Sequence, residues 1–214
     1  MENLSARCRI SAYGKIDSPS QTGTILMRPL VYSFFVCCCF SFSAKAQVRA
    51  APGREFQITK ITKNLIATPD YGIAQYRPAT NERWFEVEVE FNAAAEWTDE
   101  LTLKYYILFN GRLLTGDVTH TNILGGREKR SVMYIPPNVL THFSDNRPIT
   151  TASCQNVAVQ IAQAGGVKDE ASLQRAPAQW FAGIQQIPGL LLNKDQTPFA
   201  SLYWDRYEQI KTGR

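Results

Sequence analysis

The sequence predicts an all-β protein, an antiparallel β-sandwich followed by one C-terminal α-helix. Two observations predict the sheet. Polar and apolar residues alternate with a period of two in several segments after residue 55, and Gly, Pro and Asn-Gly turn signals separate these segments. About seven short strands with this spacing are typical of a sandwich. A helical period that occurs only after residue 198 predicts the terminal helix.

The residues before the predicted domain resemble an export signal. Within Met27–Ala46, Arg28 provides a basic end, Leu30–Phe42 is an uncharged apolar run, and Ala44-Lys45-Ala46 fits the small-residue rule for cleavage. The run is shorter than the roughly 20 residues that a helix needs to cross a bilayer. We therefore expect a cleaved signal peptide and export to the periplasm or the outer cell surface. A retained anchor is the alternative.

Residues 1–26 show no core-forming period and are rich in Ser, Gly and small polar residues. Translation that starts at Met27 would leave them out; if they are made, we expect a disordered leader that is lost with the signal. Residues 47–214 are then the domain to be explained, and their length suits a single domain.

The predicted domain is close to electrically neutral. The chain has 23 Lys and Arg against 19 Asp and Glu, and five of the former and two of the latter lie in residues 1–46. Residues 47–214 therefore have 18 basic and 17 acidic side chains, a net charge of +1. Nucleic-acid binding needs a basic stripe with interleaved aromatic residues, so we expect no nucleic-acid partner.

Cys154 is the one cysteine after residue 46, so no disulfide can form within residues 47–214. We expect an inert, half-buried thiol. Pairing between two chains is the alternative, and it leaves a homo-oligomer open.

The first strands follow from the alternation. Phe56–Ile66 is the opening strand, with a bulge because the pattern slips between Ile58 and Ile61. Arg83–Phe91 alternates most regularly, and Leu101–Phe109 repeats the pattern. We expect the apolar faces of these two strands to pack together: Phe85, Val87, Val89 and Phe91 against Leu103, Tyr105 and Ile107.

Turn signals predict the rest of the sheet. Asn110-Gly111 is a strong hairpin signal, and the return strand runs from Arg112 towards Ile123. Gly125-Gly126 predicts a further turn before the strand Lys129–Ile135, which Pro136 ends. Further along, we expect a strand at Gln155–Ile161 and a long loop with a short helix at residues 165–190. The exposed sheet edges are predicted at Phe56–Ile66 and after Pro188.

The terminal helix is predicted from its start signals and its period. Thr197 can cap it, Pro198 suits the first helical position, and Phe199–Lys211 follows the helical period. Its polar face is acidic, so the apolar face is expected to pack on the sandwich and not on a membrane. Arg206 lies near the middle of the apolar stripe, where it either reaches out to solvent or pairs with a carboxylate.

The sequence contains no G-x-S-x-G, H-E-x-x-H, P-loop or C-x-x-C motif. Of the two histidines, His120 lies among threonines and His142 lies in a loop beside Phe143, contexts that give neither a catalytic role. We expect no enzymatic activity, no catalytic, cofactor-binding or metal-binding residues, and no cofactor.

The strongest candidate for a site is the row Glu86, Glu88 and Glu90. Neighbouring members of such a row lie roughly 6.5–7 Å apart, which is too wide for all three to bind one Ca²⁺. Paired carboxylates at this separation suit glycoside hydrolysis, but that reaction also needs a cleft. We expect a face that is solvated or neutralised across strands, with Lys104 and Arg112 as partners.

The last part of the chain resembles a known family. Leu190–Ala200, followed by Tyr203–Tyr207, is similar to the ending of exported immunoglobulin-like proteins from bacterial type IV pilus-like gene clusters, and Arg83–Phe91 fits the same family. The resemblance implies an immunoglobulin-like sandwich and a pilus-associated or cell-surface role, without catalytic residues. The sequence lacks the pilin pattern of a short leader followed by an apolar helix with Glu at its fifth position. We therefore expect an accessory protein and not the filament subunit.

Two functions remain open. The first is a non-enzymatic envelope or cell-surface module that binds an envelope or pilus-like protein partner and has no membrane span in its mature chain. The second is a carbohydrate-binding or glycan-processing protein that stacks sugars on aromatic side chains. Three coplanar exposed rings would favour glycan binding, and buried rings would favour the module. The candidate platforms are Trp84, Trp97, Trp180, Trp204 and neighbouring tyrosines.

Overall fold

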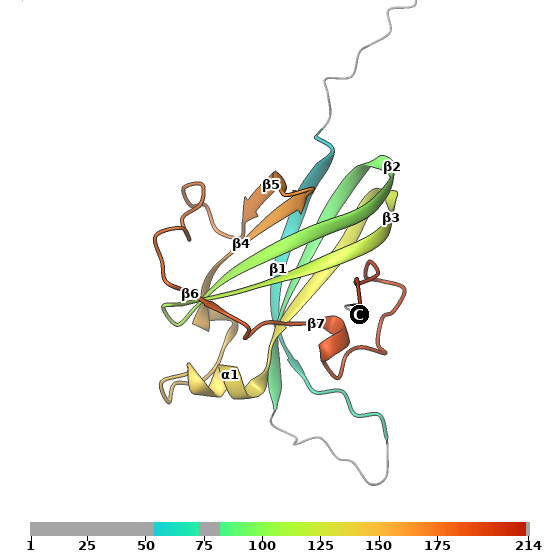
Figure 1. The fold of residues 1–214 in the computed structure, drawn as a ribbon. Helices are drawn as coiled ribbons and strands as arrows, with labels where there is room; N and C mark the ends of the chain where they lie inside the picture. Colours follow the sequence, from blue (N-terminus) through green and yellow to red (C-terminus); the bar gives the residue numbers. More distant parts are fainter. Residues whose placement is uncertain (1–53, 73–81, 213–214) are drawn as a thin grey trace, which may run out of the picture. The chain divides into compact units, whose positions relative to one another are not determined.

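The strands of the described chain form one seven-stranded sheet (Figure 1). The computed structural model describes residues 54–72 and 82–212, so the predicted leader 1–26, the signal peptide Met27–Ala46 and its cleavage site lie outside the described residues. The strands are β1 (Phe56–Ala67), β2 (Arg83–Phe109), β3 (Arg112–Ile135), β4 (Cys154–Gln163), β5 (Gly166–Ser172), β6 (Gln186–Pro188) and β7 (Leu192–Asn193). The helical segments are α1 (Pro137–His142) and the 3-10 turns η1 (Thr151–Ser153) and η2 (Lys194–Gln196).

The sheet order is β5-β4-β2-β3-β6, with β1 added to β2 and β7 added to β3. Every pairing is antiparallel except that of β3 with β6. The all-β prediction is therefore confirmed. An immunoglobulin-like sandwich of two separate sheets is not, because the described strands belong to a single mixed sheet.

Two long strands organise this sheet. The first part of β2, up to Ala93, pairs with β1 and with the second part of β3. The part after Trp97 pairs with the first part of β3 and with β4. Each of these strands was predicted as two, and the turn predicted at Gly125-Gly126 is wrong because β3 continues through it. A Cβ added at Gly125 would lie 2.2 Å from the carbonyl oxygen of Ala95, so the glycine allows close backbone contact where the register shifts.

Two hairpins have the same local geometry. The predicted Asn110-Gly111 turn is confirmed, with φ of 44° and 77°. Ala164 and Gly165, with φ of 49° and 80°, form a second hairpin between β4 and β5. Residues 165–190, predicted as a loop with a short helix, instead contain the strands β5 and β6.

The core lies between the two parts of β2, as predicted. Tyr105 crosses this core, and its hydroxyl donates to Ser131 Oγ at 2.8 Å, next to Val89 in the register of β2 and β3. The predicted bulge in β1 is also present, between Ile58 and Lys60. The side chains predicted to pack together are fully buried in one cluster: Phe85, Val87, Val89, Phe91, Leu103, Tyr105 and Ile107.

The predicted helix at Phe199–Lys211 is wrong. The backbone there forms isolated turns, such as that from the N–H of Leu202 to the carbonyl oxygen of Phe199, and Tyr203 has a φ of 52° that a helix cannot accommodate. The segment leaves helical geometry because an open strand edge offers its backbone groups better partners. The N–H of Thr121 donates to Gln209 O at 2.9 Å, and the N–H of Lys211 donates to Thr119 O at 2.7 Å.

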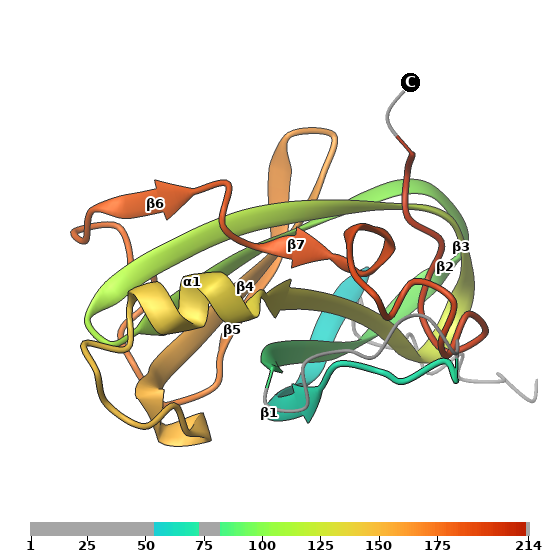
Figure 2. The same ribbon diagram turned by 90° about the horizontal axis from the view of Figure 1, so that it is seen from below.

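Residues 186–211 therefore cover the outer edge of β3 (Figure 2). Along β3, β6 pairs with Leu113–Thr115, and β7 pairs with Met133 and Tyr134. Between them, the backbone of Gln209 and Lys211 bonds to Thr121 and Thr119. The segment after Pro188 therefore lies at an edge of the sheet, as predicted, because β6 and β7 each pair with β3 alone among the described strands. Four apolar or aromatic side chains of the predicted helical face still pack against the protein interior: Phe199, Leu202, Tyr207 and Ile210. The fifth, Tyr203, is exposed.

Side chains link β1 to the strands β4 and β5. The N–H of Ile58 donates to Asp169 Oδ2 at 2.7 Å, and Arg54 pairs with the same carboxylate at 3.2 Å. Lys63 Nζ donates to the carbonyl oxygen of Cys154 at 2.6 Å. The predicted edge at Phe56–Ile66 is thus partly occupied. The Cys154 thiol is buried, and this burial raises its pKa to about 11, as expected of an inert thiol.

Candidate functional site

The three glutamates of the predicted row lie on the first part of β2, but they are less exposed than expected. Glu88 is only 6% exposed, while Glu86 and Glu90 are half-buried. The predicted partners are wrong. Lys104 lies in the second part of β2 opposite Asp117 and Gln160, and Arg112 lies at the hairpin opposite Phe109.

Glu88 is held by the C-terminal segment. Arg206 Nη2 donates to Glu88 Oε1 at 2.8 Å, and the Tyr207 hydroxyl donates to Glu88 Oε2 at 2.6 Å. Burial and this hydrogen bond both raise the pKa of Tyr207, so the phenol remains a donor. Of the two alternatives for Arg206, pairing with a carboxylate is the one observed. A buried carboxylate needs such charge-assisted bonds, because its loss of hydration is otherwise uncompensated.

The other two glutamates differ in their partners. Glu90 forms ion pairs with Arg130 at 3.3 Å and Lys60 at 3.8 Å. Glu86 accepts hydrogen bonds from two neutral donors, Asn64 Nδ2 and the Tyr134 hydroxyl, each at 3.2 Å. Among residues 54–72 and 82–212, no Lys or Arg nitrogen lies within 4.0 Å of Glu86. Of the three, Glu86 is therefore the one that forms no ion pair in the described structure.

Glu86 lines a pocket of about 340 Å³ between β1 and the C-terminal segment. We call this the Glu86 pocket. Its aromatic walls are Tyr134, Phe199, Tyr203 and Tyr207, and its aliphatic walls include Ile66 and Leu202. The rings of Tyr134 and Phe199 are stacked, with centroids 4.9 Å apart, so this wall is firmly packed. Arg206 and Asn64 supply the remaining polar lining.

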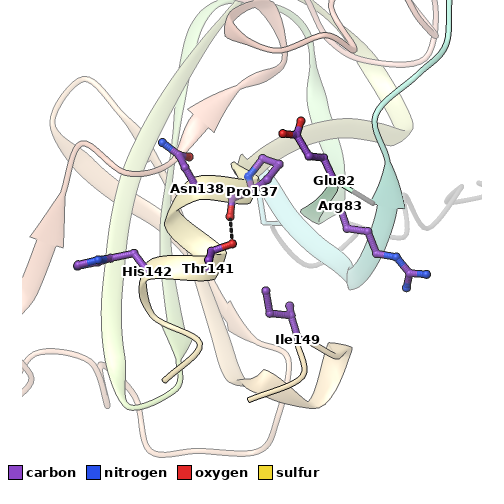
Figure 3. A pocket seen from close by; sticks show the side chains of 7 residues that line it. All are labelled: Glu82, Arg83, Pro137, Asn138, Thr141, His142 and Ile149. Carbon is purple, nitrogen blue, oxygen red and sulfur yellow. Dashed lines mark hydrogen bonds between the residues drawn. The ribbon is translucent and has the colours of Figure 1, made fainter. Parts of the chain in front are cut away.

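A larger pocket of about 670 Å³ lies between α1 and the start of β2 (Figure 3). Figure 3 shows His142 extending from α1 away from Glu82 and Arg83, and the hydroxyl of Thr141 is occupied by the carbonyl oxygen of Pro137 at 2.9 Å. The titratable side chains of this pocket therefore do not converge on a common point. Its size alone does not make it a reaction site.

The structure also brings together a serine and a histidine that are far from obvious in the sequence. His120 Nε2 lies 2.7 Å from Ser131 Oγ, and its Nδ1 lies 3.0 Å from the carbonyl oxygen of Glu208. Burial lowers the pKa of His120 to about 4. The pair resembles a nucleophile and its base, but His120 and Ser131 are 1% and 0% exposed, so no substrate can reach them. The sequence carried no signal for this pairing, because the bend in β3 creates it.

The four tryptophans do not form a common platform. Trp84 is buried against Tyr134 and Phe199, and Trp180 is half-buried beside Phe181. Trp97 and Trp204 are exposed, but they lie on different elements, the bend of β2 and the C-terminal segment. Three coplanar exposed tryptophan rings, the arrangement that would favour glycan stacking, are therefore not formed.

Residues 54–72 and 82–212 contain no group of three or more His, Cys, Asp or Glu side chains placed to hold a metal ion. None of the helices in residues 54–72 and 82–212 is long and apolar enough to cross a bilayer.

Comparisons with known proteins place the chain in a family. No curated protein matches it. Four chains of solved structure do, and one of them is the crystal structure of a protein from Akkermansia muciniphila, with 20% sequence identity and a TM-score of 0.63. That match covers 75% of this chain and 94% of the other, and at this identity it shows the fold alone. A protein-family model matches residues 47–214, from the predicted cleavage site onwards. The chain therefore belongs to the family that this model describes.

Proposed function

We propose that the protein is a non-enzymatic interaction module of the bacterial envelope or cell surface, exported as an accessory component of a pilus-like system. We also propose that the domain is related to immunoglobulin-like sandwiches. The two parts of β2 and β3 support this relationship, since they enclose one core between them. The family match that begins at residue 47 and the fold shared with the Akkermansia protein are consistent with such a role.

One observation carries the proposal. The C-terminal segment that carries the family resemblance is anchored at Glu88 and along β3, yet it holds Tyr203 and Trp204 in solvent, 62% and 80% exposed. Large aromatic side chains on a firmly held backbone are typical anchors of protein interfaces. Two carboxylates of the row also support this proposal, because Glu88 and Glu90 form ion pairs within the fold.

A pull-down from the native host tests this function. The tagged full-length chain is expressed there, the envelope is solubilised, and bound proteins are identified by mass spectrometry. We expect recovery of a defined pilus or surface component, and loss of that component from Trp204→Ala. Trp97→Ala is the matched control, because Trp97 is also exposed but lies on a different element.

The contrary results are equally defined. If Trp204→Ala recovers the partner protein as well as the unchanged chain does, Trp204 is not an anchor of the interface. Recovery of glycan alone, or hydrolysis of a glycan that is lost in Glu86→Gln or Glu90→Gln, would replace the proposal with the carbohydrate-directed function.

A further inference from the structure

We propose that the Glu86 pocket binds a primary ammonium group at the end of an alkyl chain, supplied by a lysine side chain of the protein partner. This inference rests on the proposed function and names the chemistry by which the partner is recognised. Three features carry it: the size and walls of the pocket, the charges of Glu86 and its neighbours, and the carboxylate acceptor that Glu86 offers.

The walls suit a long, narrow side chain. A volume of about 340 Å³ lies at the small end of ligand pockets, which suits one side chain better than a cofactor. Tyr134, Phe199 and Leu202 form an apolar wall against which methylene groups can pack. A lysine stem has four such groups and buries them readily while its charged end reaches a polar partner.

The charge of the pocket favours a cation. Arg206 lies over the rings of Tyr207 and Tyr203, 5.6 Å and 6.0 Å from their centroids, and its charge is balanced by Glu88. Glu86 adds a second carboxylate, so Arg206, Glu88 and Glu86 together have a net charge of −1. An anionic ligand would meet the carboxylate of Glu86, whereas an ammonium group would find in that carboxylate an acceptor that forms no ion pair within the described chain.

A second lysine in the neighbourhood does not fill this role. The ammonium of Lys194 is 5.9 Å from the Tyr207 ring centroid, but it donates to the carbonyl oxygen of Ala200 at 2.5 Å. Lys194 is also not among the residues that line the pocket. The charge on Glu86 is therefore still available to an incoming group.

The acceptor geometry selects an ammonium group over a guanidinium. Both carboxylate oxygens of Glu86 already accept one hydrogen bond, from Asn64 and from Tyr134. A guanidinium binds best when two parallel oxygens are free for its planar fork, whereas an ammonium acts as a point charge and needs only one remaining lone pair. The neutral donors hold the carboxylate in place without cancelling its charge.

The test uses two model compounds that share a four-carbon side chain and differ in the terminal ammonium group. N-acetyl-lysine N-methylamide and its uncharged analogue N-acetyl-norleucine N-methylamide are titrated into the full processed protein, and binding is followed by amide NMR shifts of Ile66 and Leu202. We expect saturable binding of the lysine compound and about tenfold weaker binding of the norleucine compound. Glu86→Gln should weaken the lysine compound about tenfold, and Glu90→Gln, on the same strand, should leave it unchanged.

Several results would overturn the inference. They are absent or non-saturable binding of the lysine compound, equal binding of the norleucine compound, or unchanged lysine binding in Glu86→Gln. Stronger binding of acetate than of the lysine compound would mean that Arg206 and not Glu86 selects the ligand, and would overturn it as well.

The pull-down separates this inference from the proposed function. If Glu86→Gln recovers the partner as well as the unchanged protein does, the interaction function stands and the lysine site fails. If neither recovers a partner while the lysine compound binds normally, the pocket chemistry stands and the proposed partner class fails.

Discussion

Acid should destabilise this protein through His120. The carbonyl oxygen of Glu208 can only accept a hydrogen bond, so the Nδ1 of His120 carries the proton that is shared with it. Nε2 then accepts from the hydroxyl of Ser131, which in turn accepts from Tyr105. This directional chain requires a neutral imidazole. A second proton would remove the acceptor that Ser131 uses and would place a charge in the core.

The magnitude follows from the pKa. Burial lowers the pKa of His120 from 6.5 to about 4, so the unfolded chain binds a proton at higher pH than the folded chain does. The stabilisation by neutral His120 is therefore complete above about pH 6.5 and is lost as the pH falls from there towards 4. A difference of this size corresponds to about 3 kcal/mol of unfolding free energy.

Urea unfolding at pH 7, 5.5 and 4 measures this loss. Carboxylates also titrate in this range, so the informative comparison is with His120→Gln, which retains an amide donor and acceptor but does not titrate. The unchanged protein should lose about 3 kcal/mol more than the variant between pH 7 and 4. Identical pH dependence in the two proteins, or an NMR titration of folded His120 near pH 6.5, would refute the reasoning.

Three further substitutions test the packing. Glu88→Gln removes the ionised acceptor of Arg206 and should lower the unfolding free energy by about 2 kcal/mol in urea; a change well below 1 kcal/mol would mean that the contact is a weak surface pair. Val89→Asp places an unpaired charge in the core and should cost several kcal/mol, so that circular dichroism shows an unfolded or much less stable protein. Gly125→Ala forces apart two backbone segments that approach closely at Ala95 and should lower the melting temperature, whereas an unchanged melting temperature would show that the bend has room to relax.

The sequence predicts those parts of the fold that depend on neighbours along the chain. The burial of Val89 and its companions, the bulge after Ile58 and the Asn110-Gly111 hairpin are all encoded within a few residues and are confirmed. The joining of two predicted strands into β2 was missed, because a strand that bends by shifting its register looks locally like a strand, a break and a strand.

The candidate site was harder to predict because it depends on distant residues. Glu88 and Arg206 are 118 positions apart, and the residues next to Glu88 in the sequence do not indicate that its carboxylate will be buried. The helical period of the C-terminal segment was present in the sequence, but the open edge of β3 competed for the same backbone groups and prevailed. Tertiary pairing overrode a local preference, which single-sequence patterns do not reveal.

The covering of β3 by residues 186–211 also imposes an order on folding. When the chain emerges from its N-terminal end, β2 and β3 appear well before the residues that pair with Thr121 and neutralise Glu88, so for that interval the β2–β3 hairpin has an unshielded edge and an uncompensated carboxylate. Contacts over such long sequence separations also form slowly. During that interval the hairpin can accept the C-terminal segment of a second copy in place of its own, and the resulting exchange of segments would produce an intertwined dimer.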